Sequence, residues 1–297
     1  MRAPHDKSQN SVAAGFVFLT ITATGWGLNW PVMKHLLTEL PPLSARGWSG
    51  LVGAVSLAAL ALARGQTMHV PRAVWPRLVG LAMLTVGSWA ALIALSLLWL
   101  RASEAAVIAA SNSVWVSLLA LVILHERFSL ARALALAIAI SGLVILFGAD
   151  GYDASLDKLP GALLALTATL CVAFGTVLTK RFPCALPAIS LASWQIGIGC
   201  VPILLLGLWL ESASFASLSL TGWLLMAYMT FVQFCVCYAC WFAALARLPA
   251  STVSMGSLLV PVVGVLSSAL ALGEPLGLRQ VLALTLTLGG VVIAARS

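Results

Sequence analysis

The pattern of apolar and polar positions divides this chain into long apolar runs separated by short polar joints. A membrane-spanning helix needs roughly 20 predominantly apolar residues. Joints this short leave no room for a soluble domain between the runs. The sequence therefore predicts an all-α membrane protein with ten transmembrane helices. The runs fall at residues 11–33, 44–63, 74–98, 103–124, 130–148, 159–179, 187–208, 220–244, 250–272 and 278–295.

Composition agrees with this fold class and argues against several others. Of the 297 residues, 61% are hydrophobic and 8% are charged, whereas soluble domains carry roughly 25% charged residues. The net charge of +7 comes from basic residues that stand singly, so they offer no face to a phosphate backbone and no nucleic-acid partner is predicted. The six cysteines lie mostly in apolar runs without histidine. Neither a metal site, a disulfide framework nor a cofactor is expected.

Orientation follows from the placement of lysine and arginine. Short joints make neighbouring helices antiparallel, so an even number of helices puts both termini on one side of the membrane. Most basic residues lie in the terminal tails and in the joints on that same side, and basic residues are retained on the cytoplasmic side. Both termini are therefore predicted to be cytoplasmic, in a multi-pass protein of the inner (cytoplasmic) membrane. No removable signal peptide is predicted.

The second half of the chain repeats the first. A shift of 148 positions places Glu126 on Glu274 and Gly142 on Gly290. Each unit holds five helices, an odd number, so the second copy enters the membrane from the opposite side. Inverted repeats of this kind typically bind substrate near the bilayer midplane, where the halves meet, and work by alternating access. The predicted organisation is a cytoplasmic tail at 1–10, a first five-helix repeat at 11–148, an extracytoplasmic linker at 149–158 and a second five-helix repeat at 159–297.

Two short joints each carry a glutamate, in the stretches LHERF at 124–128 and LGEPL at 272–276. Together with the opening GWGLNWPVMK at 25–34, these units resemble the EamA-type ten-helix members of the drug/metabolite transporter superfamily, over nearly the whole chain. Members of that family move amino acids, nucleotide sugars, metabolites and drugs. The tryptophan-rich third and fourth runs resemble the YddG-type exporters of aromatic amino acids. The resemblance implies an exporter, with the two joint glutamates as marks of a helix turn.

Ionisable residues are nearly absent from the middle of the runs, where Arg46 is the exception. Coupled transporters commonly place proton relays or ion ligands there, so transport down the substrate gradient, or coupling without an intramembrane carboxylate, is predicted. All four histidines lie in tails or joints, which leaves no serine in a run with a histidine base at its depth, and no catalytic residue is predicted. No G-x-x-x-x-G-K-[ST] motif occurs, so no ATPase subunit is expected.

Uncharged polar and aromatic residues inside the runs are the candidate substrate-binding residues. A zwitterionic amino acid can hydrogen-bond to the amides while its side chain packs on the rings. The alternatives are interfacial placement for Trp and Tyr and bonding between helices for Asn and Gln. An interfacial belt is the expected place of Trp75, Trp99, Trp209 and Trp223. The candidates are Trp26, Asn29, Trp30, Trp89, Asn112, Trp115, Tyr228, Gln233 and Tyr238.

Three further residues have two interpretations each. Arg46, near the start of the second run, either snorkels to the outer surface or attracts the carboxylate of an amino acid. Pro31 and Pro261 lie in runs with glycines nearby, and a proline kinks a helix because it removes one hydrogen bond. They are candidate gating positions, unless the glycines serve only close helix packing.

The sequence thus predicts an exporter of aromatic or bulky apolar amino acids that works by alternating access through a central cavity. A broader metabolite or drug exporter with the same fold is the alternative within transport. A membrane scaffold or receptor that transports nothing is the alternative from another class. The expected partners are a small-molecule substrate and the lipid bilayer.

Overall fold

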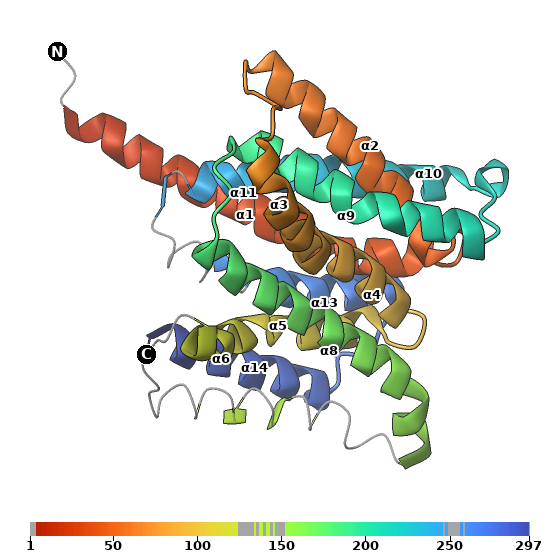
Figure 1. The fold of residues 1–297 in the computed structure, drawn as a ribbon. Helices are drawn as coiled ribbons and strands as arrows, with labels where there is room; N and C mark the ends of the chain where they lie inside the picture. The colour runs from red at the N-terminus through yellow and green to blue at the C-terminus, as the bar shows by residue number, and fades with distance from the viewer. Residues whose placement is uncertain are drawn as a thin grey trace.

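The protein is described by a computed structural model that covers residues 4–123, 152–245 and 259–296, a few isolated residues between 134 and 145, and residues 247–248 and 256–257. Every regular element in these ranges is helical, which confirms the all-α class. Figure 1 shows the helices packed side by side, with the start of α1 and the end of α14 at the same end of the bundle.

The first four predicted runs form helices, two of them interrupted. α1 spans Pro4–Leu36 and α2 spans Pro42–Ala63. The third run is built from α3 (Trp75–Ala82), a π-helical segment (Met83–Gly87) and α4 (Ser88–Ser96). The fourth run consists of α5 (Ala102–Ala110) and α6 (Asn112–Ile123).

The second half contains a corresponding series. α8 spans Tyr152–Arg181 and α9 spans Ala188–Leu210. The next run comprises α10 (Leu220–Ala227), a π-helical segment (Tyr228–Val236) and α11 (Cys237–Leu245), together called the eighth helix below. α13 (Leu259–Leu272) and α14 (Leu278–Arg296) complete the described part.

Seven of the described helices are long and apolar enough to cross a membrane, and α13 is a shorter apolar helix. The fifth predicted run (130–148) falls largely outside the described residues. The joint that carries Glu126 and the first part of the ninth run (250–258) also fall largely outside them. The total of ten helices and the inverted arrangement therefore stay predictions.

Two helices begin earlier than the hydropathy pattern predicts. α1 begins at Pro4, inside the predicted tail, and α8 begins at Tyr152, inside the predicted linker. Their candidate membrane spans begin only at Val12 and Leu156. Hydropathy detects the apolar part of a helix alone, whereas the backbone can stay helical beyond it through polar residues.

A glutamate after α9 caps the start of α2. Glu211 accepts hydrogen bonds from the backbone N–H groups of Leu43 (2.9 Å) and Ser44 (2.7 Å) and from the Ser44 hydroxyl (2.7 Å). α2 starts after Pro41 with Pro42 as its first residue, and neither gives a side-chain cap. The first N–H groups of a helix have no partner within it, so the carboxylate satisfies them.

Two more glutamates act in the same way. Glu274, between α13 and α14, accepts from the N–H groups of Ala102 (2.8 Å) and Ser103 (3.0 Å) at the start of α5, and from the Ser103 hydroxyl. Glu39, between α1 and α2, accepts from the N–H and hydroxyl of Ser219 at the start of α10, both at 2.7 Å. We call the contacts of Glu39, Glu211 and Glu274 the carboxylate clasps. Each joins the two halves of the chain, and the joints between α1 and α2, α9 and α10, and α13 and α14 all lie at one end of the bundle (Figure 1).

Two further basic residues near that end also have hydrogen-bond partners. Lys158 in α8 forms an ion pair of 2.8 Å with Glu104, whose side chain is 3% exposed in the first turn of α5. Lys34, near the end of α1, donates to the backbone carbonyls of Leu97 and Leu100. Burial of a charge is costly unless it is paired, so these contacts fasten α1, α4, α5 and α8 together.

Small residues bring α2 close to its neighbours. A Cβ on Gly47 would lie 2.6 Å from the Cα of Leu204 in α9, and one on Gly50 would lie 2.2 Å from the sulfur of Cys200. Glycine therefore allows the two backbones to approach, as it commonly does between membrane helices. This close packing positions α2 between α9 and the eighth helix.

Candidate functional site

Arg46 is 1% exposed on the inner face of α2. Its Nη1 donates to the side-chain carbonyl of Gln233 at 2.8 Å, while its Nε is buried and has no hydrogen-bond partner. No ion pair found among the described residues includes Arg46. A snorkelling side chain keeps its charged group in water, and this guanidinium does not. The structure thus shows a buried cation with unused hydrogen-bonding capacity.

Aromatic side chains from α1 and the eighth helix lie around the bonding partner of Arg46. Trp26 donates its indole N–H to the backbone carbonyl of Gln233 at 3.3 Å and packs edge-on against Tyr238, with ring centroids 5.5 Å apart. The hydroxyl of Tyr228 donates to a backbone carbonyl of α1 at 2.9 Å. Five predicted residues thus come together from three helices. We call them the Arg46 cluster: Trp26, Arg46, Tyr228, Gln233 and Tyr238.

The π-helical segment of the eighth helix supplies two members of this cluster, Tyr228 and Gln233. π-helical turns are rare and occur frequently at functional sites. Because such a turn contains more residues than an α-helical turn, it changes the directions of the side chains that follow it. A second π-helical segment precedes Trp89 in the third run. Neither segment has a signal in the hydropathy pattern.

A second group of candidates lies on α1 and α4. Trp30 is 6% exposed and contacts Trp89 edge-on, with centroids 6.2 Å apart. Asn29 is 7% exposed, and its side-chain carbonyl oxygen has no hydrogen-bond partner. Asn29 lies three residues after Trp26, so α1 presents both groups on neighbouring parts of one face. The oxygen of Asn29 can still accept a hydrogen bond from a ligand, and the Nε–H of Arg46 can still donate one to a ligand.

The candidates on α6 form a separate pair. Trp115 donates to the hydroxyl of Ser111 at 3.0 Å, at the break between α5 and α6, and the buried carbonyl oxygen of Asn112 has no partner. No hydrogen bond or ring contact among the described residues links Asn112 or Trp115 to the Arg46 cluster. Their part in substrate binding stays a prediction.

The two candidate gating prolines are both buried. Pro31 lies inside α1, which continues to Leu36, and Pro261 lies in the first described turn of α13. Near them, a Cβ on Gly27 would come within 2.5 Å of Val263. Close packing of α1 on α13 is therefore observed, and a gating role for the prolines stays a prediction.

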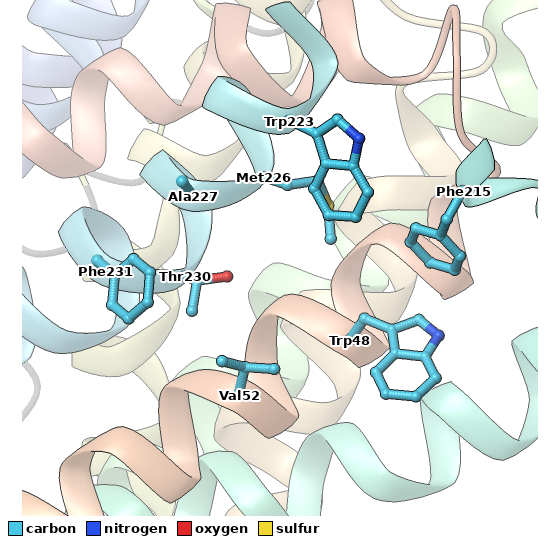
Figure 2. Close-up of a pocket in the computed structure, with 8 residues that line it drawn as sticks. All are labelled: Trp48, Val52, Phe215, Trp223, Met226, Ala227, Thr230 and Phe231. Carbon is cyan, nitrogen blue, oxygen red and sulfur yellow. The ribbon is translucent and has the colours of Figure 1, made fainter. Parts of the chain in front are cut away.

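A pocket of about 400 Å³ opens between α2 and the eighth helix (Figure 2). None of its residues is among the predicted binding residues, and Trp223 is expected in the interfacial belt. The sequence signal is a stripe of residues at helical spacing, 223, 227 and 230–231, which hydropathy alone does not separate from a lipid-facing stripe. The lining residues are Trp48, Val52, Phe215, Trp223, Met226, Ala227, Thr230 and Phe231.

Comparisons with a family model, with curated relatives and with a solved structure each match nearly the whole chain. The model of the EamA-like transporter family matches it twice, at residues 13–148 and 159–296. A probable amino-acid metabolite efflux pump of Salmonella typhimurium is 30% identical over 288 residues, which cover 94% of this chain and 93% of that protein. The uncharacterized transporter YvbV of Bacillus subtilis is 26% identical over 270 residues, with 90% and 87% covered. A crystal structure of a protein 18% identical in sequence has a TM-score of 0.68 and 96% coverage of both chains.

Proposed function

Because this chain belongs to the EamA-like transporter family, we propose that it exports amino acids with aromatic or bulky apolar side chains across the cytoplasmic membrane. The family and the names of the relatives indicate a transporter rather than an enzyme. Two relatives at 30% and 28% identity carry the name probable amino-acid metabolite efflux pump. That name supports a small amino-acid-like substrate.

The observation that carries the proposal is the unpaired guanidinium of Arg46. A buried charge without a partner costs several kcal/mol, and in a membrane such a charge is tolerated mainly where it serves function. Gln233 occupies only one of its donor groups. A substrate carboxylate supplies the missing negative charge and can bind the guanidinium through two parallel hydrogen bonds.

The aromatic rings of the Arg46 cluster can contact the ammonium group and the side chain of the substrate. Trp26 and Tyr238 pack together beside Gln233, and a third ring, Trp241, lies 5.4 Å from Trp26. The faces of indole and phenol rings attract an ammonium group and pack well against another ring. An aromatic amino acid offers both features, together with the carboxylate.

Transport follows from movement of the two halves against each other. The carboxylate clasps hold the halves together at one end of the bundle, which supports a state that is closed at that end. Release at that end requires the clasps to break, and reclosure restores them. Alternating access of this kind is the usual mechanism of transporters built from two repeats, with Pro31 and Pro261 as the proposed bending points.

The test is flux in liposomes that contain the purified protein. Labelled tryptophan, phenylalanine, threonine and lysine are supplied with and without a proton gradient, and tryptamine, which lacks the carboxylate, is added as competitor. We expect saturable flux of tryptophan and phenylalanine without the gradient, and weak competition by tryptamine. Competition by tryptamine equal to that by tryptophan would contradict the proposed binding of the substrate carboxylate by Arg46. Absence of amino-acid flux would favour the broader metabolite exporter.

A further inference from the structure

The pocket between α2 and the eighth helix opens on the side of the bundle. Both helices are candidate membrane spans. Three of the lining side chains are exposed, Val52 by 42%, Trp223 by 50% and Phe231 by 52%. Exposed apolar side chains within a span are typical of a lipid-facing surface, which favours entry to this pocket from the bilayer over entry from water.

The wall of the pocket is aromatic. Trp48 and Phe215 meet nearly at right angles, with centroids 6.1 Å apart, and Phe215 and Trp223 are tilted by 38° with centroids 6.2 Å apart. Rings prefer edge-on or offset contact with other rings, so this arrangement favours an additional ring as occupant. The volume of about 400 Å³ lies within the usual range for small-molecule sites, roughly 300–1,000 Å³.

A single hydroxyl distinguishes the pocket from an ordinary lipid-facing groove. Thr230 is 5% exposed, and Figure 2 shows its oxygen pointing into the space between the apolar side chains. Among the described residues this hydroxyl has no hydrogen-bond partner. A polar group in apolar surroundings costs free energy when it is unbonded. An acyl chain cannot satisfy it, whereas a heteroaromatic ring with an N–H or oxygen can.

The contact between α2 and the eighth helix lies between this pocket and Arg46. On that contact the Ser49 hydroxyl approaches the sulfur of Met226 at 3.5 Å, and Gly53 faces Phe234. Ser49 follows Arg46 by three residues, so the two lie on the same face of α2. This contact includes the small Ser49 and Gly53 and the flexible Met226 beside Phe234, and no ion pair among the described residues closes it.

We propose that this pocket binds the ring of a small heteroaromatic molecule dissolved in the bilayer, with the Thr230 hydroxyl as its polar contact. The site gives those molecules that also carry a carboxyl group a lateral route to the Arg46 cluster, a step that rests on the proposed function. Binding at the pocket itself does not depend on transport. It can therefore be measured separately.

The experiment uses the full chain in lipid nanodiscs and an indole that carries a photoreactive diazirine, with the labelled peptides identified by mass spectrometry. We expect saturable labelling of the peptides of α2 and the eighth helix that line the pocket, displaced by excess indole. Val52→Trp fills the pocket and should lower this labelling at least tenfold. The matched control is Val55→Trp, because Val55 lies on α2 outside the pocket and is 62% exposed; it should stay within twofold of the original chain.

Thr230→Val tests the hydroxyl without filling the pocket. It keeps the shape of the side chain, and loss of one hydrogen bond should weaken labelling about fivefold. Unsaturable labelling spread over lipid-facing residues such as Leu205 and Trp209 would overturn the proposal. Labelling displaced by a lipid with photoreactive acyl chains, but not by indole, would also overturn it, in favour of an acyl chain. Labelling that persists in a chain without amino-acid flux would refute only the proposed function.

Discussion

Three glutamates at one end of the bundle are fully engaged in hydrogen bonds, whereas several polar groups in its interior have unbonded atoms. At the end, Glu39, Glu211 and Glu274 each accept at least two hydrogen bonds from the start of another helix. In the interior, Arg46 keeps its Nε unbonded and Asn29 keeps its carbonyl oxygen unbonded. The protein thus satisfies the hydrogen-bonding groups of these residues at one end of the bundle and leaves those of Arg46 and Asn29 unsatisfied in the interior.

The difference separates two tasks. A hydrogen bond to a charged group contributes about 1.5–3 kcal/mol, so the satisfied end stabilises this arrangement of the two halves. An unpaired buried group costs free energy in the absence of a ligand and gives it back when a ligand completes the contact. The interior is therefore expected to lower the stability of the ligand-free protein and to favour ligand binding.

The largest expected effect comes from giving Arg46 a negatively charged partner within the protein. Gln233→Glu places a carboxylate 2.8 Å from the Arg46 guanidinium if the side chain keeps its position. The internal ion pair should raise the apparent Tm by several degrees, because it removes an unpaired buried charge. It should also reduce tryptophan flux at least 100-fold, because it occupies the substrate site. Both quantities are measured on purified protein and in liposomes.

Gln233→Met is the matched control for that substitution. It has a similar length and no charge, so it removes one hydrogen bond without blocking the guanidinium. Flux should fall about tenfold, because the guanidinium loses the hydrogen bond that holds it in position, a bond worth about 1.5–3 kcal/mol, and the apparent Tm should not rise. Normal flux in Gln233→Glu would show that substrate does not need the guanidinium.

Weakening a clasp should lower the stability of the protein and leave its flux nearly unchanged. Glu274→Gln weakens three hydrogen bonds at the start of α5 and should cost about 1–3 kcal/mol of stability, seen as a lower apparent Tm. Ser103→Ala removes only one of the three and should cost less. Tryptophan flux should stay within about threefold in both variants. Loss of flux at an unchanged Tm would place Glu274 on the substrate path.

The sequence predicted the fold class well because membrane helices are encoded by apolar length. It placed the edges of α1 and α8 less well, since polar residues such as those after Pro4 and Tyr152 continue the helices. For the Arg46 cluster, composition singled out the polar and aromatic residues. It could not give the pairing of Arg46 with Gln233, which are 187 positions apart.

The pocket could not be predicted for a related reason. Trp48 on α2 and Trp223 on α10 both have the apolar pattern of lipid-facing or interfacial residues, and only the packing of the two helices makes them walls of one space. The clasps are similar, because a glutamate in a joint has no sequence signal that identifies Ser44 or Ser103 as its partner. Long-range pairings need the tertiary structure.

The smallest expected effect belongs to the clasp of Glu39, which joins the α1–α2 joint to α10. The backbone N–H of Ser219, and then its hydroxyl, hold the pKa of the Glu39 carboxyl below its ordinary value. A lowered pKa in the folded state means that the ionised carboxylate stabilises the fold. This contribution is fully present above the ordinary glutamate range, about pH 4, and is lost as the pH falls through the lowered value.

Glu39→Gln should therefore lower the apparent Tm slightly at pH 7, by less than Glu274→Gln does, and the difference from the original chain should disappear at low pH. Ser219→Ala provides the contrast, because the Ser219 hydroxyl also accepts the N–H of Gly222 as the N-cap of α10. Loss of an N-cap costs about 1 kcal/mol and does not depend on the carboxylate, so part of its deficit should persist at every pH. A Glu39→Gln deficit that is equally large at low pH would mean that the clasp acts through packing and not through the charge of Glu39.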